Sequence, residues 1–352
     1  MNSIEIESLY TSGAYPKRGV AIVRGQGARV WDDDGREYID CVAGHGVANV
    51  GHCNPAVVEA ICQQAATLIT CPEIFYNDVR ARLLQRLVSI APAGLERAFL
   101  CNSGTEAIEA ALKFTRLSTG RKQVVATMRG FHGRTLGALS ATWEPKYREP
   151  FQPLLEGFVH VPYNDLQAMQ QAVTSETAAV LIEIVQGEGG VNPGQPDYLL
   201  GVAQICRESG ALLIADEVQT GFGRTGLMFA CGHTGLQPDM LCLAKGLAGG
   251  LPMGAVLLGP RVEGLKPGVH GSTFGGSPLA CAAALAVIDY IVAHDLPARA
   301  ARQGAWALDR LRAISAPIVR EVRGLGLMIG IDLRQRVTPY LKALMGEGVL
   351  AL

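Results

Sequence analysis

The sequence has almost no excess of charge of either sign. Its 352 residues include 31 Lys and Arg against 32 Asp and Glu, a formal net charge of −1. Proteins that bind nucleic acid along their surface carry a marked positive excess, so we expect no nucleic-acid partner. With 49% hydrophobic and 18% charged residues, the chain can form a large core. Its length favours two domains, or one large domain with an appendage.

Signals for metal binding, secretion and membrane insertion are also missing. The nine cysteines contain no Cys-x-x-Cys pair, so we expect no metal site. Their odd number, without a basic and apolar leader at residues 1–5, favours reduced thiols in the cytoplasm. The apolar run at residues 279–288 is too short to span a bilayer and ends at Asp289, so a helix packed inside the protein is expected.

The pattern of apolar runs predicts an α/β fold. Residues 20–42 read as short strands joined by a turn at residues 32–35. From about residue 98 to 300, continuous apolar runs alternate with helical stretches, which is typical of a mostly parallel sheet covered on both faces. The runs lie at residues 98–101, 124–126, 179–182, 211–214 and 240–243. In such sheets ligands bind beyond the carboxyl ends of the strands.

Chemically informative residues follow four of these runs. Ser103, Gly104 and Thr105 open a helix whose free N–H groups suit a phosphate, although the same motif also serves as an ordinary helix cap. No Gly-Lys-Ser or Gly-Lys-Thr motif occurs, which argues against a nucleoside triphosphate site. Phe131 could stack on a planar cofactor and Arg134 could clamp a carboxylate, or both could be structural.

Asp216 and Lys245 form the most informative pair. A carboxylate ending an apolar strand needs a cationic partner, which a structural ion pair or a protonated heterocycle could supply. A lysine at such a position can extend to solvent, or it can lie in a dry cleft where a lowered pKa frees its amine for Schiff-base chemistry. The two residues are separated by about one strand–helix–strand unit, so both can face one cleft.

Together these motifs resemble the class III aminotransferases that depend on pyridoxal phosphate, in their acetylornithine/ornithine branch. The resemblance extends from about residue 10 to 352. A closer similarity, through Thr-Trp-Glu-Pro-Lys-Tyr-Arg-Glu-Pro at residues 142–150, is to the aminotransferases of lysine synthesis that act on an amino-group carrier protein. The ordered motifs lie at residues 102–107, 131–135, 186–190, 216–221, 244–245 and 271–276.

This resemblance implies a fold-type-I structure with a mostly parallel seven-stranded sheet. It implies a large domain over residues 50–300 that binds pyridoxal 5'-phosphate. Residues 1–49 and 301–352 would form a smaller α+β domain.

The resemblance also implies a role for each site residue. The catalytic residues would be Lys245, which binds the cofactor as a Schiff base and moves a proton, and Asp216, which pairs with the pyridinium nitrogen. The phosphate would be held by Ser103, Gly104 and Thr105, and by Thr273 across the interface of a homodimer with shared active sites. The ring would be contacted by Phe131, Val218 and Gln219. The substrate would be bound by Arg134 and Glu188.

The implied reaction exchanges an amino group between glutamate/2-oxoglutarate and a semialdehyde, either N-acetylglutamate semialdehyde or a carrier-bound aminoadipate semialdehyde. An acidic carrier protein as partner would predict basic residues at the cleft mouth. The candidates are Lys17, Arg18, Arg24 and Arg29. Ornithine and 4-aminobutyrate aminotransferases are alternative activities.

One departure from the family pattern concerns the C-terminus. Members of the family continue with a segment of the form Ile-Arg-Phe-x-Pro-Pro-Leu and a final helix, which this sequence lacks after Leu352. The arginine of that segment would pair with Glu188 and help to bind the α-carboxylate. We therefore expect that either the sequence is a truncated form of a longer chain, or the protein lacks part of its small domain. The second case would leave an exposed apolar surface and weaken substrate selection.

Two other functions remain as alternatives. Residues 221–226 fit the Gly-x-Gly-x-x-Gly pattern of nicotinamide dehydrogenases, but a poor helix follows and no acidic strand end lies about 20 residues on. A non-catalytic relative that binds pyridoxal phosphate is the other alternative. The presence of both Asp216 and Lys245 argues against it.

Overall fold

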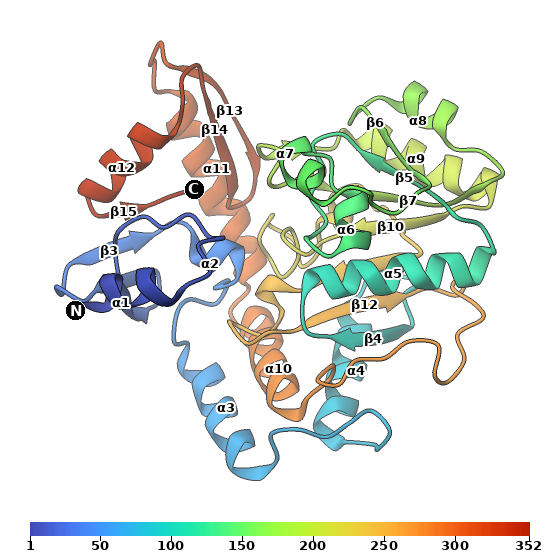
Figure 1. Ribbon diagram of the computed structural model, residues 1–352, viewed down its shortest axis with the longest axis horizontal. Coiled ribbons are helices and arrows are strands. Elements are labelled where there is room, and N and C mark those ends of the chain that lie inside the picture. The colour runs from blue at the N-terminus through green and yellow to red at the C-terminus, as the bar shows by residue number, and fades with distance from the viewer.

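The computed structural model describes all 352 residues, which form a large body and a smaller one. Figure 1 shows both chain termini in the smaller body, where the first and last segments of the chain lie together. The large body contains the middle of the chain and is built around one central sheet.

The central sheet has seven strands in the order β4-β12-β11-β10-β7-β5-β6. β12 is antiparallel to both of its neighbours, and the pairs from β11 to β6 are parallel. The expected mostly parallel α/β sheet is thus confirmed, and the five predicted apolar runs lie within five of its strands. The strands are β4 (Arg97–Cys101), β5 (Gln123–Thr127), β6 (Phe158–Val161), β7 (Thr177–Glu183), β10 (Leu212–Asp216), β11 (Met240–Leu243) and β12 (Gly254–Leu258).

Helices cover both faces of this sheet. Successive strand residues point to opposite faces, so in β10 Leu213 and Ala215 join one apolar cluster while Leu212 and Ile214 join the other. Burial of both faces explains why the strands are continuous apolar runs. One face is covered by α3 (Pro55–Thr67), α4 (Asp78–Ile90), α8 (Leu166–Ala172), α9 (Pro196–Ser209) and α10 (Pro278–Ala293), and the other by α5 (Gly104–Thr119) and α6 (Leu136–Ala141).

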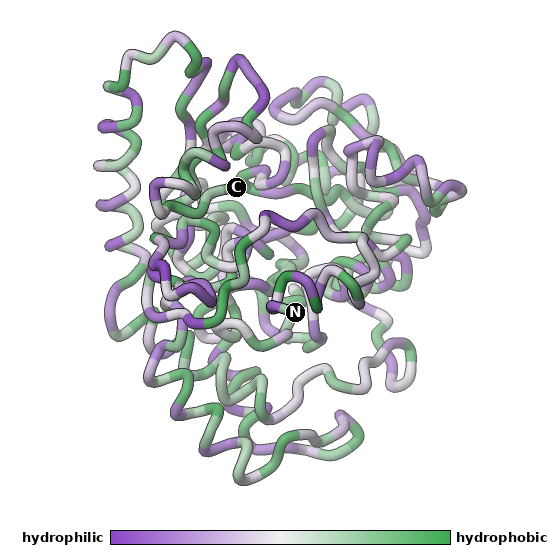
Figure 2. The backbone as a smooth tube through the Cα atoms, turned by 60° about the vertical axis from the view of Figure 1, so that its left-hand side comes forward, coloured by the Kyte–Doolittle hydropathy of each residue, from purple (hydrophilic) through white to green (hydrophobic).

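The start of α3 follows from its sequence. Its apolar side chains are mostly exposed, however, and only Val57 is buried. The side chain of Asn54 accepts a hydrogen bond from the first turn, and a proline follows at the first helical position, as expected. Val57 is buried, whereas Val58 is 42% and Leu68 is 44% exposed. Apolar spacing alone does not show which surface has a partner. Hydrophobic segments also reach the lower edge of the molecule, where α3 and the loop after it lie (Figures 1 and 2).

The smaller body joins the two ends of the chain in one sheet. Its strand order is β1-β2-β3-β15, and β15 runs parallel to β3. The predicted N-terminal strands and turn are present.

The remaining α-helices and strands of both bodies lie outside the large sheet and its covering helices. They are α1 (Ser3–Tyr10), β1 (Ile22–Gln26), β2 (Arg29–Asp32), β3 (Glu37–Asp40), α2 (Ala43–Gly46), α7 (Pro145–Arg148), β8 (Val185–Gln186), β9 (Asn192–Pro193), α11 (Leu296–Arg312), β13 (Val319–Leu325), β14 (Met328–Leu333), α12 (Thr338–Gly346) and β15 (Val349–Leu350).

The apolar run at residues 279–288 lies within α10, which is largely buried against α3 and α4. The prediction of an internal helix is confirmed. Taken singly, none of the helices is both long enough and apolar enough to cross a membrane. The pair α10 and α11, bent by 63° at their junction, meets these criteria of length and composition only when the two are joined.

Candidate active site

The carboxyl ends of the large sheet's strands border a cavity of about 400 Å³. All but one of the predicted site residues line it. Thr273 is the exception, because it lies on an exposed loop before α10. The predicted residues that line the cavity are Ser103, Gly104, Thr105, Phe131, Arg134, Glu188, Asp216, Val218, Gln219 and Lys245.

The N-terminus of α5 supplies free hydrogen-bond donors to one end of the cavity. Ser103 caps the helix, and its side chain accepts a hydrogen bond from the N–H of Glu106. The first helical bond runs from the N–H of Ala107 to the carbonyl of Ser103. The N–H groups of Gly104 and Thr105 therefore precede the helical ladder, and together with the dipole of this 16-residue helix they suit an anion.

Close approach of backbone explains two of the glycines here. A Cβ on Gly104 would lie 2.8 Å from a methyl carbon of Val218, so any larger residue would displace the side chain predicted to contact the cofactor ring. Gly133 has φ = 137°, and a Cβ there would lie 2.3 Å from the hydroxyl of Thr105. Both glycines thus allow the loops around the cavity to converge.

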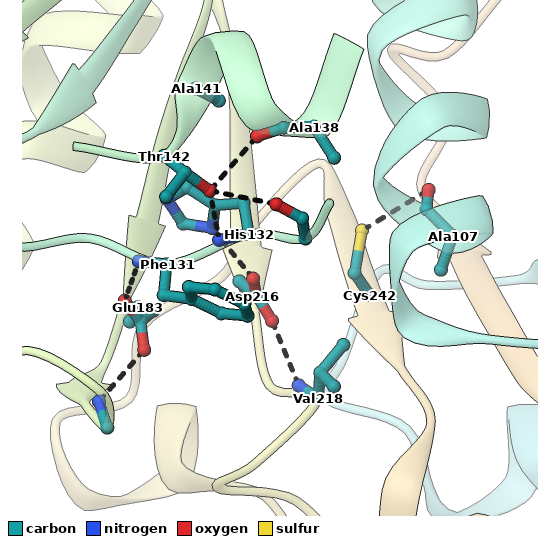
Figure 3. A network of polar contacts seen from close by, with 12 residues as sticks. Ala107, Phe131, His132, Ala138, Ala141, Thr142, Glu183, Asp216, Val218 and Cys242 are labelled. Carbon is teal, nitrogen blue, oxygen red and sulfur yellow. Dashed lines mark hydrogen bonds and ion pairs between the residues drawn. The ribbon is translucent and has the colours of Figure 1, made fainter. Parts of the chain in front are cut away.

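Asp216 lies at the buried end of β10 and is held by two donors. Its Oδ2 is 2.7 Å from Nδ1 of His132, and its Oδ1 accepts a hydrogen bond of 3.0 Å from the N–H of Val218 (Figure 3). Burial alone would lower the pKa of His132. The hydrogen bond to Asp216 and the charges of Asp216 and Glu183 outweigh burial and raise that pKa above its ordinary value. A buried imidazole with a raised pKa therefore stands beside the carboxylate.

A second buried carboxylate, Glu183, ends the neighbouring strand β7. It pairs in register with Asp216. Its two oxygens accept hydrogen bonds of 2.9 Å from the N–H groups of Phe131 and Gly187 (Figure 3). Burial raises the pKa of Glu183 to about 7, against the opposing effect of His132. Glu183 thus connects the loop of Phe131 to the turn that contains Glu188.

Lys245 follows β11 and extends into the same cavity. Its φ of 36° is in the left-handed region, which is strained for a residue with a side chain. Burial lowers the pKa of Lys245, although the charges of Glu188, Asp216 and Glu183 oppose this effect. The lowered pKa leaves a larger fraction of this amine unprotonated than in an ordinary lysine. Nζ also has no hydrogen-bonded or ion-paired partner within the chain, so the amine is free to react.

Arg134 and Glu188 lie at the exposed edge of the cavity. Neither side chain forms an ion pair within the chain. Among the carboxylates whose charges raise the pKa of Lys245, Glu188 has the largest effect. The guanidinium of Arg134 lies over the ring of Tyr147, 3.6 Å from its centre. Both residues therefore remain available to a ligand.

The four basic residues proposed for the cleft mouth do not line the cavity. Lys17 is paired with Glu7, Arg29 with Glu37, and Arg18 donates to the carbonyl of Ala351. Arg24 stacks on Trp31 at 3.9 Å. Arg134 is the only arginine that lines the cavity, and Lys146 lies outside the lining with its Nζ 4.8 Å from the centre of the Tyr147 ring that Arg134 also contacts.

These residues fit pyridoxal phosphate. The cavity offers an anion site at one end, a buried carboxylate at the other and an unpartnered lysine amine with a lowered pKa between other charged groups. The phosphate would be held by the turn at residues 103–105, and the ring nitrogen by Asp216. Residues 221–226, by contrast, form turns with no helix after them, unlike a dinucleotide-binding loop.

Two residues of the site were missed by sequence reasoning. The sequence gives no local signal for His132, because its contact with Asp216 spans 84 residues. Glu183 offered the same signal as Asp216, a carboxylate that ends an apolar strand, and could have been found from it. No group of three or more His, Cys, Asp or Glu side chains is arranged to hold a metal ion.

Comparison with known proteins agrees with this site. Residues 10–352 match the family Aminotransferase class-III. The chain is 52% identical over 350 residues to the [LysW]-aminoadipate semialdehyde transaminase of Deinococcus radiodurans, covering 98% of this chain and 82% of that protein. It is 49% identical to the acetylornithine aminotransferase of Methanopyrus kandleri, covering 94% and 85% of the two chains.

Solved structures show the same relationship. The ornithine aminotransferase of Toxoplasma gondii ME49 superposes with a TM-score of 0.95 at 36% identity, covering 99% of this chain and 86% of that one. A second structure of that enzyme describes partial occupancy of pyridoxal phosphate at its active site. The chain therefore belongs to the class-III aminotransferases, enzymes that use pyridoxal phosphate to transfer amino groups.

Proposed function

We propose that this aminotransferase exchanges an amino group between glutamate/2-oxoglutarate and an ω-semialdehyde in lysine or arginine biosynthesis. The observation that supports it best is the meeting of Lys245 and Asp216, from the ends of the adjacent parallel strands β11 and β10, in one cavity with the free N–H groups of α5. Such an arrangement combines an amine, a buried anion and a phosphate site.

Each group has a chemical task in this proposal. The bound cofactor supplies an electron sink for the carbanion that forms at the substrate carbon. Lys245 Nζ, which has no partner and a lowered pKa, anchors the cofactor and accepts and returns the proton of that carbon. Asp216, held by His132, keeps a negative charge at the floor of the cavity. Ser103, Gly104 and Thr105 orient the phosphate.

The substrate carboxylate is assigned to Arg134. Its guanidinium can bind a carboxylate through two parallel hydrogen bonds. Glu188 lies at the same edge of the cavity, where its charge can meet the amino group of a substrate. Together they would orient an amino acid with its carboxylate outward.

The semialdehyde is proposed from the relatives. The two most informative names are a [LysW]-aminoadipate semialdehyde transaminase and an acetylornithine aminotransferase. We propose carrier-bound aminoadipate semialdehyde and N-acetylglutamate semialdehyde as the two candidates, with an acidic carrier protein as partner in the first case. Arg134, which lines the cavity, and the exposed Lys146, which contacts the same Tyr147 ring, are candidate cations for such a partner. Ornithine is a further candidate amino donor, because an ornithine aminotransferase shares the fold at 36% identity.

We also propose a homodimer in which Thr273 reaches the phosphate of the partner. Thr273 is exposed and lies outside the cavity of its own chain. Large apolar side chains are exposed nearby, among them Phe274 at 65% and Ile74 at 83%. Exposed apolar side chains of this size favour association with another protein surface.

The domain division and location complete the proposal. The pairing of β15 with β3 supports a small domain made from residues 1–49 and 301–352, with residues 50–300 as the large domain. Nine unpaired cysteines, five of them buried, suit the reducing cytoplasm.

Replacement of the lysine tests the activity. We expect Lys245→Ala to abolish steady-state transamination, with glutamate as donor, while circular dichroism and the melting temperature stay close to those of the wild type. Lys113→Ala, on an exposed face of α5, is the matched control and should retain full activity. Turnover by Lys245→Ala would contradict the mechanism. A wild-type protein that shows no turnover would favour a non-catalytic relative that binds pyridoxal phosphate.

The substrate is tested by comparing kcat/KM for N-acetylglutamate semialdehyde and for carrier-linked aminoadipate semialdehyde. A higher value for the carrier-linked aldehyde supports the lysine pathway, and the reverse supports the arginine pathway. A higher kcat/KM for ornithine than for either aldehyde would instead support the alternative activity of an ornithine aminotransferase.

A further inference from the structure

The ring of Tyr147, in α7, lies beside two residues of the candidate site, which also approach each other, with the guanidinium carbon of Arg134 5.6 Å from the centre of the Phe131 ring. Its centre is 3.6 Å from the guanidinium carbon of Arg134. The ring of Phe131 meets it edge to face, with 6.0 Å between centres and an angle of 81°. Tyr147 therefore contacts both the aromatic side chain predicted to cover the cofactor ring and the arginine predicted to bind the substrate.

The segment that contains Tyr147 is fixed to the loop that contains Arg134. The N–H of Trp143 donates to the carbonyl of Gly130 at 2.9 Å. The hydroxyl of Thr142 accepts a hydrogen bond of 2.9 Å from the N–H of His132 and lies 3.3 Å from the carbonyl of Gly133. The chain just before α7 is thus tied to residues on either side of Phe131, and the N–H of Tyr147 donates to the carbonyl of Glu144 at 3.0 Å, which together support the ring beside Arg134.

Stacking holds an arginine without using its donors. The N–H groups of a guanidinium lie in its plane, whereas an aromatic ring interacts with the face of that plane. A carboxylate partner within the chain would occupy the same donors that a substrate needs, and Arg134 has no such partner. The ring of Tyr147 therefore restricts the long side chain of Arg134 while its donor edge stays free.

We infer that Tyr147 is a positioning residue that holds the guanidinium of Arg134 ready to bind the carboxylate of the substrate. The inference rests on the proposed role of Arg134 in carboxylate binding. Tyr147 would thereby make the site selective, because only substrates that present a carboxylate to Arg134 benefit from the orientation of its side chain. Substrates without a carboxylate gain nothing from it.

The test uses the enzyme loaded with pyridoxal phosphate and the dicarboxylate glutarate, which has no amino group to react. We expect Tyr147→Leu to raise the dissociation constant of glutarate, measured by isothermal titration calorimetry, by about 2- to 30-fold. The KM for glutamate should rise by the same factor while kcat changes less than about twofold, since the loss affects orientation of the bound carboxylate. The kcat/KM for pentylamine, which has no carboxylate, should stay unchanged.

Three further variants make the test decisive. Tyr147→Phe keeps the ring and should bind glutarate within about twofold of the wild type. Tyr290→Leu removes another stacked tyrosine, on α10 and outside the cavity lining, and should have no effect on glutarate binding. Arg134→Ala removes the group that Tyr147 is inferred to hold and should weaken glutarate binding at least as much as Tyr147→Leu does.

The outcomes separate the inference from the function on which it rests. Weakened glutarate binding by Arg134→Ala but not by Tyr147→Leu would overturn the inference and leave the role of Arg134 standing. Equal loss by Tyr147→Leu toward glutamate and pentylamine would assign Tyr147 to general packing and also overturn it. Unchanged binding by Arg134→Ala would reject the role of Arg134 together with the inference.

Discussion

Replacing His132 by leucine removes the one side chain that is hydrogen-bonded to Asp216. The two side chains are 0% and 5% exposed and lie 2.7 Å apart. In the variant, Asp216 keeps only the N–H of Val218, at 3.0 Å. Removal of one partner from a buried charged pair costs about 3–5 kcal/mol, because the other charge stays buried without compensation. We expect the free energy of unfolding of the cofactor-free protein to fall by about that amount.

The effect of His132→Leu should depend on pH with a definite sign. An unfolded histidine has a pKa of about 6.5, and the pKa of His132 in the folded protein is raised above it. A raised pKa gives a contribution that is fully present below about pH 6.5 and is lost as pH rises through the folded value. The difference between wild type and His132→Leu should therefore be larger at pH 6 than at pH 9.

The assay is urea denaturation at these two pH values, followed by tryptophan fluorescence. His132→Asn is the matched variant, because its amide nitrogen can take the place of Nδ1 and donate to Asp216 without carrying a charge. It should recover part of the stability at pH 9 and show less pH dependence than the wild type. Stability of His132→Leu within about 0.5 kcal/mol of the wild type, or a difference that grows with pH, would refute the reasoning.

Three other substitutions test separate features of the structure. Gly104→Ala places a methyl group 2.8 Å from Val218, so pyridoxal phosphate affinity, measured by fluorescence titration, should fall at least about tenfold, and unchanged affinity would reject the close fit. Glu183→Gln removes a carboxylate whose pKa is raised to about 7 by burial. Its ionisation costs stability as pH rises through this range, so the wild type should lose stability relative to Glu183→Gln between pH 5 and 8, and no relative change in urea denaturation would count against it. Arg80→Met leaves the carbonyls of Cys71, Phe75 and Gly276 without their buried donor, which should cost about 3 kcal/mol or more. An unchanged melting temperature would contradict the assigned contacts.

The sheet and most of the site could be predicted because their signals are local. A short apolar run buried on both faces indicates a strand, and the parallel arrangement brings the residues after several runs to one edge. Ser103, Asp216 and Lys245 follow this rule. The position of Thr273 outside the cavity was also expected, since its predicted contact lies in another subunit. Which side chains of α3 are buried could not be predicted, because apolar spacing does not reveal which of them another surface covers.

Asp216 and Glu183 show where local reasoning ends. Both are carboxylates that close an apolar strand, and they occupy paired positions on neighbouring strands. Asp216 faces a protonatable imidazole, whereas Glu183 faces two backbone N–H groups. His132 and Phe131 both come from one loop that is distant in the sequence from either carboxylate, so the sequence around each carboxylate could not distinguish the two. The difference decides their chemistry, because the donors of Glu183 belong to the backbone and secure two loops, whereas Asp216 is paired with a titratable side chain. A carboxylate at the end of an apolar strand therefore predicts a site. The groups that donate hydrogen bonds to it decide whether it acts on a ligand or secures the surrounding loops.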